Sequence, residues 1–447
     1  MKFETLRKKV IKPGLCTHCG TCVGLSNGVL HFNETSKGPL PDGDLSCDIP
    51  DEAFDACPGK GLHYGNLNKI IFNTLPDNWL IGNYKNLYVG YSGNDDIRLK
   101  GASGGVITQI LIYLMKTKQI DGAVVLKHGI PKPWLAEPII ATSEKEIIEA
   151  SQSVYAPIPV NTILEEVKSF TGKVAFVGLP DQVASIRYLQ SVQHPSVKNI
   201  EYVLGPYVGI NMYAGSVLRF ARSNGIKNPD SIKEVKYRDG EWPGYLRITT
   251  HDNKTVKAEK FYYNYLLPFY ITRSTLYSID FTNDLTDISV GDAWNPVYEK
   301  EGKGFAVVIA RNEKAAKLLQ QMKKEKALIL EEKLLNDILN MHGHMLDFKK
   351  RGAFVRMSFR KALGRRIPDY GIWPKKLGLS RYLVEVVIFG VIVLCSNRFA
   401  RFMLGIIPIS VIGRFFNFSR KSWKNMSKPT KRKGLSNQEY IIKSTTL

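Results

Sequence analysis

The sequence predicts a protein of mixed α+β and α/β class with three regions: a small cysteine-rich module at residues 1–75, a central α/β domain at 84–345 and a helical, basic C-terminal region at 346–447. Three observations support this division. Five of the six cysteines precede residue 58, strand and helix patterns alternate from Asn86 onward, and the positive charge is concentrated near the C-terminal end. A chain of 447 residues is long enough for two or three domains with cores of their own.

The first module is characterised by the spacing of its thiols. Cys16, Cys19 and Cys22 form a C-x2-C-x2-C run, and Cys57 follows later with Pro58 directly behind it. In two-cluster ferredoxins such a run supplies three ligands of one cluster, and the cysteine before the proline of the other run supplies the fourth. The spacing therefore predicts one 4Fe–4S cluster on these four thiols in a ferredoxin-like module. A structural zinc site, which usually joins two C-x2-C pairs, is the alternative.

A second ferredoxin run is present only as a remnant. It aligns on Cys47, Pro50, Ala53 and Cys57, which keeps the spacing but lacks both middle thiols, and Ser26 stands where the first run would end. The two middle thiols missing from the second run and the last thiol missing from the first run would all be ligands of the same cluster. We therefore expect a single cluster here and no role for Cys47. Metal-binding thiols together with a charged N-terminus that has no apolar run indicate a cytoplasmic location.

Alternating patterns in the central domain predict its elements in order. They are a strand at 87–93, a helix at 105–118, a strand at 121–129, a helix at 163–170, a strand at 173–179, a helix at 181–190, a strand at 200–210 and a helix at 216–226. A hairpin follows at 235–261 with its turn at Asp252 and Asn253. A last strand and helix are expected at 305–312 and 313–327.

The C-terminal region carries most of the charge. Residues 345–447 contain 22 Lys and Arg against 4 Asp and Glu, which gives this stretch +18 of the net +21. Two apolar segments, 382–395 and 402–416, precede a basic tail, but the uninterrupted apolar run at 386–395 is about half of what a bilayer span needs. We expect an interfacial helix pair on an anionic membrane surface, at the inner face of the membrane, or a partner-subunit interface. Nucleic acid is the third candidate, and we expect none because no nucleic-acid motif accompanies the charge.

Two motifs of the central domain lie where a strand or loop meets a helix. In GASGG, at 101–105, Ser103 and the amides of Gly104 and Gly105 precede a helix and can approach a phosphate, although a plain helix cap is the alternative. Asp181 and Gln182 follow the strand at 173–179, at the end of a strand where α/β sheets bind ligands. An N-cap role for the aspartate explains its position equally well.

Two further motifs place polar side chains at turns and strand ends. YRDGEWPG at 237–244 offers Arg238, Asp239 and Trp242 to a ring or phosphate, or forms a hairpin closed by its own ion pairs. DISVGDAW at 287–294 is a strand whose end carries Asp292 and Trp294, which suits a site better than a core.

In this order, GASGG with the helix and strand after it, VAFVGLPDQVASIRYL at 174–189, YRDGEWPG and DISVGDAW resemble the coenzyme F-420 hydrogenase/dehydrogenase β-subunit family over residues 12–320. The resemblance implies a flavoprotein that passes electrons between iron–sulfur clusters, FAD and an organic acceptor. It implies that the polar residues of the four motifs contact FAD: Ser103, Gly104, Gly105, Asp181, Gln182, Arg238, Asp239, Trp242, Asp292 and Trp294. Tyr155 and Arg273 are further candidates for the flavin pocket.

The sequence lacks all four cysteines of one ligand set that is common in the family. Family members commonly carry a cluster inside this domain, on cysteines of a P-C-Q motif, an L-F-C motif and a C-x2-C pair. Those places read here Asp181, Val208, Thr275 and Ser278. Because all four thiols are missing together, we expect that the domain does not hold a cluster of its own.

The leading hypothesis is an iron–sulfur flavoprotein oxidoreductase with one 4Fe–4S cluster and FAD, served by ferredoxin, a reduced deazaflavin or another carrier. The alternative is a non-catalytic electron-transfer or docking subunit of a larger redox or cell-envelope biosynthesis complex. A zinc-stabilised nucleic-acid-binding protein is a third hypothesis. The sequence contains no zinc-protease motif, Walker loop or nucleophile triad, which argues against hydrolases and nucleotide-driven motors.

Overall fold

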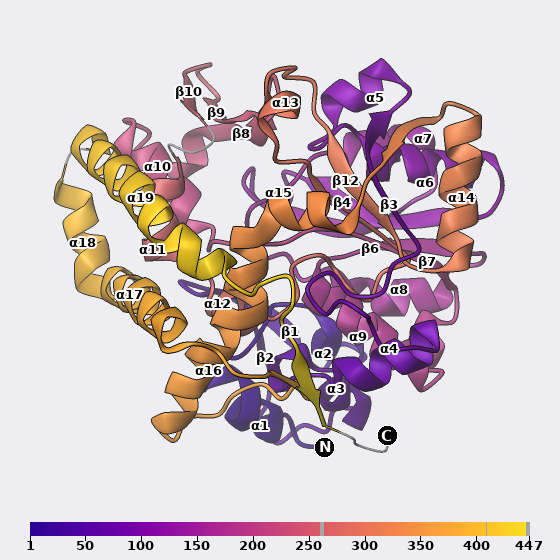
Figure 1. The fold of residues 1–447 in the computed structure, drawn as a ribbon, viewed down its shortest axis with the longest axis horizontal. Helices are drawn as coiled ribbons and strands as arrows, with labels where there is room; N and C mark the ends of the chain where they lie inside the picture. The colour runs from indigo at the N-terminus through magenta and orange to yellow at the C-terminus, as the bar shows by residue number, and fades with distance from the viewer. Residues whose placement is uncertain (260–262, 408, 444–447) are drawn as a thin grey trace.

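A computed structural model describes residues 1–259, 263–407 and 409–443, and an eight-stranded mixed sheet forms its centre (Figure 1). The strand order across the sheet is β13-β3-β12-β11-β7-β6-β4-β5. The strands are β3 (Asn86–Ser92), β4 (Gly122–His128), β5 (Ala136–Ala141), β6 (Val174–Val177), β7 (Ile200–Pro206), β11 (Ile288–Asp292), β12 (Ala306–Ala310) and β13 (Leu328–Glu332).

The strand directions bring four loops to one edge of this sheet. β4, β6, β7 and β11 are parallel to their neighbours in this series, and β12 runs antiparallel to both β11 and β3. β3 consequently points the same way as β11, so the carboxyl ends of β3, β11, β7 and β6 share an edge. Adjacent strands lie about 4.8 Å apart, which places the ends of β3 and β6 roughly 19 Å from each other. Ligands of open α/β sheets bind at such an edge.

Helices cover both faces of the sheet. On one face α6 (Val106–Lys116), α7 (Glu144–Glu149) and α14 (Glu313–Lys324) pack against the strands. On the other lie α8 (Leu164–Ser169) and α9 (Pro180–Ser191), with α15 (Leu335–Asp347) over β3 and β12. β12 is buried on both sides, which is why its sequence AVVIA is an uninterrupted apolar run.

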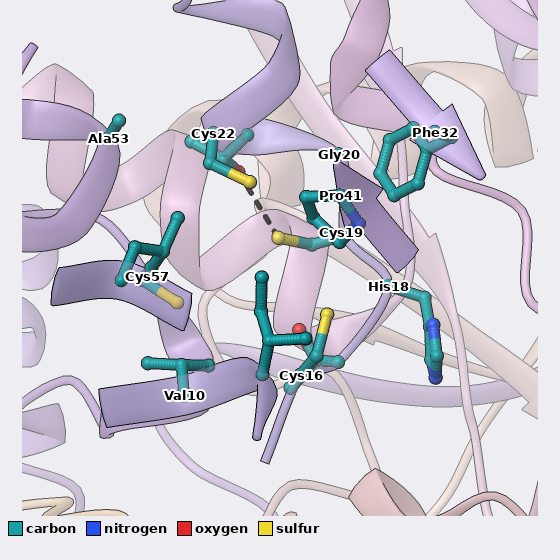
Figure 2. Close-up of a pocket in the computed structure, with 14 residues that line it drawn as sticks. Val10, Cys16, His18, Cys19, Gly20, Cys22, Phe32, Pro41, Ala53 and Cys57 are labelled. Carbon is teal, nitrogen blue, oxygen red and sulfur yellow. Dashed lines mark hydrogen bonds between the residues drawn. The ribbon is translucent and has the colours of Figure 1, made fainter. Parts of the chain in front are cut away.

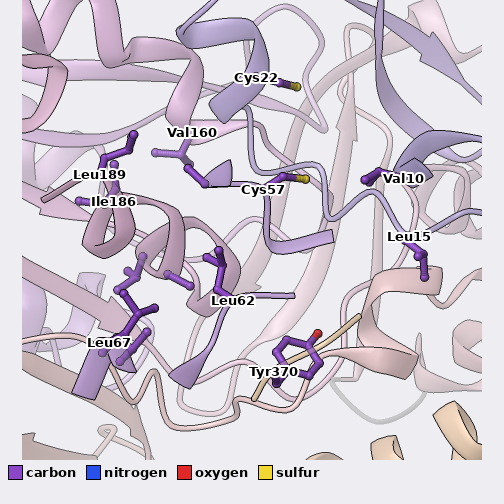
Figure 3. Close-up of a cluster of buried hydrophobic side chains, with 14 of the residues drawn as sticks. Val10, Leu15, Cys22, Cys57, Leu62, Leu67, Val160, Ile186, Leu189 and Tyr370 are labelled. Carbon is purple, nitrogen blue, oxygen red and sulfur yellow. The ribbon is translucent and has the colours of Figure 1, made fainter. Parts of the chain in front are cut away.

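The cysteine-bearing module is docked against α8 and α9. It consists of α1 (Phe3–Leu6), α2 (Thr21–Gly24), the hairpin β1 (His31–Thr35) and β2 (Gly38–Asp42), α3 (Asp51–Asp55) and α4 (Tyr64–Phe72). Figure 3 shows Cys22, Cys57 and Leu62 of the module in one cluster with Val160, Ile186 and Leu189 of the α/β domain. The approach is so close that a Cβ on Gly24 would lie 2.1 Å from the carbonyl oxygen of Asn161.

The predicted central elements are confirmed, and several additional ones are present. The hairpin is part of a three-stranded antiparallel sheet of β8 (Ile232–Asp239), β9 (Tyr245–Thr250) and β10 (Thr255–Glu259), with Asn253 in a positive-φ conformation at its second turn. Residues 260 and 261, the end of the predicted hairpin, lie outside the described residues. The sequence patterns did not predict β5, β13 or α7. The helix predicted at 216–226 is α10 (Gly215–Ser223).

The C-terminal region is more helical than predicted. It contains α16 (Ala353–Ala362), β14 (Ile372–Pro374), α17 (Leu379–Cys395), α18 (Arg398–Ile406), α19 (Ile409–Arg432) and β15 (Tyr440–Ile442). The second predicted apolar segment is divided between α18 and α19, and the basic tail continues α19. β15 pairs with β14 beside the first module, where the amide of Asp369 donates to Lys60 O at 2.8 Å. Residues 408 and 444–447 of this region are not described.

Part of the positive charge of this region is internal. Lys349, Lys350 and Arg356 are each at most 2% exposed, and Lys350 and Arg356 pair with Asp284 and Glu385. The basic segment 345–447 is therefore not a uniform charged surface, and its exposed basic residues are divided between residues 361–376, helices α18 and α19, and the end of the chain.

None of the described helices combines the length and the apolar composition that crossing a membrane requires. The adjoining helices α17 and α18 meet that test only when taken together, and they are bent by 71° at their junction.

Candidate functional site

Four thiols line one pocket of the first module. Cys16, Cys19, Cys22 and Cys57 surround it together with apolar side chains that include Val10. Figure 2 shows the four sulfur atoms directed toward a common space, with Cys57 arriving from the opposite side to the Cys16–Cys22 loop. Cys19, Cys22 and Cys57 are each less than 10% exposed. The four cysteines predicted as ligands thus line one pocket, and Cys47 is not among the lining residues, while their role as cluster ligands stays a prediction.

The donor set consists of four thiols, a ligand type that both iron–sulfur clusters and structural zinc sites use. Among the described residues, no three His, Cys, Asp or Glu side chains are arranged to hold one metal ion. Zinc requires four ligands about 2.3 Å from one point, whereas a cubane offers a separate iron to each thiolate and needs a wider ring of sulfurs. Burial, reinforced by the neighbouring thiols, raises the pKa values of Cys16, Cys22 and Cys57. Four thiolates are therefore stable in this pocket only around a cationic centre.

The loop that carries the thiols is fixed by contacts to the α/β domain. Gly20 has φ = +98°, and a Cβ there would lie 2.7 Å from the carbonyl oxygen of Pro159. Asn161 is fully buried, and its backbone amide donates to Cys19 O at 2.9 Å. Its side-chain amide donates to Thr21 Oγ1 at 2.9 Å and to Gln182 O at 3.1 Å. Asn161 thus joins the cysteine loop to the first turn of α9.

A second, polar pocket shares a wall with the cysteine pocket. Thr17 and His18 line both. The second pocket is formed by loops that follow β6 and β7, by the segment 272–280 and by Lys349. All four positions at which the sequence lacks the thiols of the resembled family lie in its wall: Asp181, Val208, Thr275 and Ser278.

Charged side chains dominate the chemistry of this polar pocket. Burial raises the pKa of Asp181 to about 6, and burial lowers the pKa of Lys349 to about 8. Lys349 Nζ donates to Thr275 O at 3.1 Å, and Ser278 Oγ lies 3.4 Å from Asp181 Oδ1. Asp280 is 1% exposed, and its Oδ1 atom is buried without a hydrogen-bond partner. Carboxylate and hydroxyl oxygens are poorer ligands of an iron–sulfur cluster than thiolates, and an ammonium group cannot be a ligand.

Three of the predicted motifs meet at Asp292, at the carboxyl end of β11. Arg238 binds its carboxylate with two hydrogen bonds of 3.0 Å, and Trp242 Nε1 donates to Oδ1 at 2.8 Å. Ser103 Oγ donates to the same oxygen at 2.5 Å. The ring of Trp294 lies 5.0 Å from that of Trp242 with an interplanar angle of 34°. Burial alone would lower the pKa of Arg238, but the carboxylate of Asp292 beside it raises that pKa instead.

The glycine-rich loop lies at the same place. Gly104 and Gly105 have φ of +71° and +69°, and α6 begins immediately after them. The Gly104 carbonyl accepts from Ser92 N at the end of β3, at 2.7 Å. The loop is therefore held at the sheet edge that also carries Asp292.

The other predicted flavin contacts lie elsewhere. Asp239 forms ion pairs with Arg247 and Lys257 at 3.2 and 3.8 Å, within the β8–β10 sheet. Gln182 lines the polar pocket, and its side chain is bonded to the backbone of Ile158 and Leu179 at 2.8 Å. Asp181 lines that pocket too.

The two additional flavin candidates, Tyr155 and Arg273, lie in different parts of the structure. Tyr155 is hydrogen-bonded to Arg238 and so belongs to the Asp292 group. Arg273 packs against Gly14 of the first module, and its backbone amide donates to Tyr213 Oη at 3.2 Å.

Sequence reasoning missed three residues of these sites: Asn161, Asp280 and Lys349. None belongs to a recognisable motif, and each becomes notable only through partners far away in the chain. The sequence around Asp280 gave no signal, because a single aspartate after a helix is common in loops.

Two family models match the chain. The model "Coenzyme F420 hydrogenase/dehydrogenase, beta subunit N-term" matches residues 87–165, and the model for the C-terminal part of the same beta subunit matches residues 171–334. Together they cover more than half of the chain, and they include the four motifs but not the C-terminal region.

Similar proteins come from methanogenic archaea. The coenzyme F420 hydrogenase subunit beta of Methanococcus voltae is 26% identical over 297 residues, 64% of this chain and 99% of that protein. The coenzyme F420-dependent sulfite reductase of Methanocaldococcus jannaschii is 23% identical over 346 residues, 74% of this chain, which spans only 49% of that protein. A chain of the F420-reducing [NiFe] hydrogenase complex from Methanosarcina barkeri superposes with a TM-score of 0.52 at 19% identity, covering 66% of this chain and 99% of that one. That likeness shows a shared fold.

Proposed function

The chain belongs to the coenzyme F420 hydrogenase/dehydrogenase beta-subunit family, and from this premise we propose that it is an iron–sulfur flavoprotein oxidoreductase subunit. It carries one 4Fe–4S cluster and one FAD, and exchanges electrons with a deazaflavin of the F420 type, with ferredoxin or with another organic carrier. The observation that supports the proposal best is the convergence of four thiols on one buried pocket.

The residues around Asp292 are the proposed flavin site. The amides that begin α6 can donate to a pyrophosphate, and the faces of Trp242 and Trp294 suit a flat ring. Arg238 supports this site by holding the Asp292 carboxylate in place. Ser103, Asp292 and Trp294 are only half-buried, so this edge is accessible from solvent. The flavin supplies the conversion between single electrons and hydride. Asp292 orients Arg238 and Trp242 by accepting hydrogen bonds from both.

The proposed electron route follows the sheet edge. The Asp292 group lies at the end of β11, and the polar pocket lies at the ends of β7 and β6, one and two strands further along. The cysteine pocket comes next, across Thr17 and His18. Electrons from the cluster therefore have to pass the polar pocket, without an intermediate cluster, to reach the flavin.

The proposal is tested by mixing the anaerobically purified protein with reduced F420 and, separately, with reduced ferredoxin. We expect the absorbance of bound oxidised FAD to bleach with at least one donor. A matched pair of variants locates the site: Arg238→Gln should abolish bleaching by releasing FAD, and Asp239→Asn, one residue along the same strand, should leave it unchanged. A protein that binds no flavin, or whose flavin stays oxidised with both donors, contradicts the proposal.

A second candidate is a non-catalytic docking subunit, and one specific observation favours it. A complete ligand set of the family is replaced here by Asp181, Val208, Thr275 and Ser278, which together line the polar pocket. Such a subunit would contain the cluster but no reducible FAD. Cluster reduction by dithionite in a protein that lacks flavin would select this candidate.

A further inference from the structure

The three C-terminal helices form a surface that differs from the rest of the protein. Figure 1 shows α17, α18 and α19 as a unit that projects at one side of the molecule. We call this unit the C-terminal hairpin. Of the 28 exposed large apolar side chains among the described residues, 15 lie between residues 379 and 426, which is about a ninth of the chain. Concentration of apolar surface in one place marks a site of interaction.

The exposed apolar side chains follow helical spacing. On α18, Phe399 and Phe402 are 72% and 65% exposed and share a face with Ile406. On α19, Val411, Phe415 and Phe418 recur at intervals of four and three residues and are all exposed. Further exposed members of this surface are Val386, Val387, Val391, Val393 and Leu394 of α17 and Met426 of α19.

The opposite side of the C-terminal hairpin is fixed to the body of the protein. In α17, Arg381 and Glu385 are buried and bond to each other at 2.7 Å, and Arg381 also bonds to Asp347 of α15. In α18, Leu404 is buried and its carbonyl accepts from Arg219 at 2.7 Å. The inner face is thus occupied by specific contacts to the body of the protein.

Charge accompanies the apolar surface. Residues 386–438 contain ten Lys and Arg and no Asp or Glu. Arg414, Lys421 and Lys428 are exposed and stand at intervals of seven along α19, on the flank of the strip that carries Val411 and Phe415. Helices with an apolar face flanked by basic residues lie in the interface of anionic membranes.

We propose that the C-terminal hairpin docks this protein onto the surface of an anionic phospholipid bilayer, with Phe399, Phe402, Phe415 and Phe418 inserted among the lipids and the basic side chains paired with headgroups. The helices lie in the plane of the surface, since the bend of 71° between α17 and α18 does not allow them to continue as one straight span. A protein partner would have to match the six exposed positive charges of residues 386–438 as well as the apolar side chains, and a lipid surface of negative headgroups matches both at once. The proposal goes beyond the redox function and does not depend on it.

The test is flotation of the full-length holoprotein with vesicles of phosphatidylcholine alone and of phosphatidylcholine mixed with phosphatidylglycerol. We expect binding to the mixed vesicles only, weakening as salt is added. The triple variant R414Q/K421Q/K428Q should bind about a hundredfold more weakly, because each basic residue near an anionic surface contributes about fivefold. The variant F402Q/F415Q should lose binding at any salt concentration.

Matched controls remove the same groups from other exposed positions: K118Q/K145Q/K303Q for charge and L99Q/L334Q for apolar surface. Both should float like the unaltered protein, and iron content in every variant confirms that the fold is intact. Equally poor binding to both kinds of vesicle would overturn the proposal. So would a vesicle-independent dimer that F402Q/F415Q dissociates, since it would make the surface a protein interface.

Discussion

The cysteine pocket and the polar pocket are neighbours that share Thr17 and His18, yet they differ completely in donor chemistry. The first is walled by apolar groups and offers four soft thiol ligands. The second offers carboxylates, hydroxyls and one ammonium group, and contains the buried Asp280 Oδ1 without a partner. Thiolates are the usual ligands of iron–sulfur clusters and hard oxygen ligands are poor ones, so we predict one cluster and not two.

The polar pocket lies where the resemblance implies a second ligand set in the family, and the loss of that set here stays a prediction. Its wall lies at the ends of β6 and β7, and its charges compensate one another in part, with Lys349 close to Asp181. A single missing thiol would leave an incomplete ligand set, whereas a complete replacement leaves an ordinary polar cavity.

The strongest effect should come from removing a thiol of the first pocket. Cys57→Ala should lower the iron content from about four per chain to less than about one, because the apolar wall offers no substitute ligand. Iron and acid-labile sulfide analysis after anaerobic purification measures this. Cys47→Ala is the control and should keep all its iron, because Cys47 does not line the pocket. Equal loss from both variants would show that the ligand set is wrong.

The second-largest effect should come from giving the polar pocket the four thiols that it lacks. Cysteines placed together at positions 181, 208, 275 and 278 should raise the iron content after cluster reconstitution from about four to about eight, because all four positions line one cavity. The same positions changed to serine provide the control, and that variant should stay at about four. A folded four-cysteine variant that gains no iron would mean that the side chains at these positions do not converge.

A third prediction concerns the group around Asp292. Asp292→Ala leaves Arg238 buried without its partner, which should lower the free energy of unfolding by about 3–5 kcal/mol and weaken FAD binding at least thirtyfold, about 2 kcal/mol. Asp239→Ala removes ion pairs of the outer sheet and should cost no more than about 1 kcal/mol. Thermal unfolding and flavin fluorescence of the two variants give the comparison. Similar losses of stability and of FAD binding in both variants would show that Asp292 and Asp239 do not have different roles.

The weakest effect is a pH dependence from the polar pocket. The raised pKa of Asp181, about 6, lies above its ordinary value, so between about pH 4 and pH 6 the folded protein keeps a proton that the unfolded chain loses. This group therefore lowers stability as pH rises through that window. Asp181→Asn removes the dependence and should raise the unfolding temperature at pH 7 by roughly 1–3 °C, with no gain at pH 4. The exposed Asp77→Asn serves as control, and an equal gain at both pH values would contradict the assignment.

Local sequence patterns were sufficient to predict which four thiols lie together and where most strands and helices occur. The grouping of the cysteines follows from spacing alone, and the interior strand at 306–310 is an uninterrupted apolar run. β5 and β13 form the two edges of the sheet and are more polar, with Pro138 in one and three exposed residues in the other. Such edge strands resemble loops in sequence.

The candidate flavin residues show where sequence information ends. Arg238 and Asp239 are adjacent in one motif, but successive side chains of a strand point to opposite faces. Arg238 therefore reaches Asp292, whereas Asp239 faces Arg247 and Lys257. Lys349 could not be assigned to the polar pocket because it stands 168 positions after Asp181, and only the tertiary fold brings them together.

Iron, sulfide, zinc and flavin, all quantified on one anaerobically purified sample, test the difference between the two pockets in a single experiment. We predict about four irons and four sulfides with one FAD per chain, and no zinc. About eight irons would contradict this prediction by showing that the polar pocket holds a cluster after all. Zinc in place of iron, or iron without any flavin, would contradict the proposed redox function.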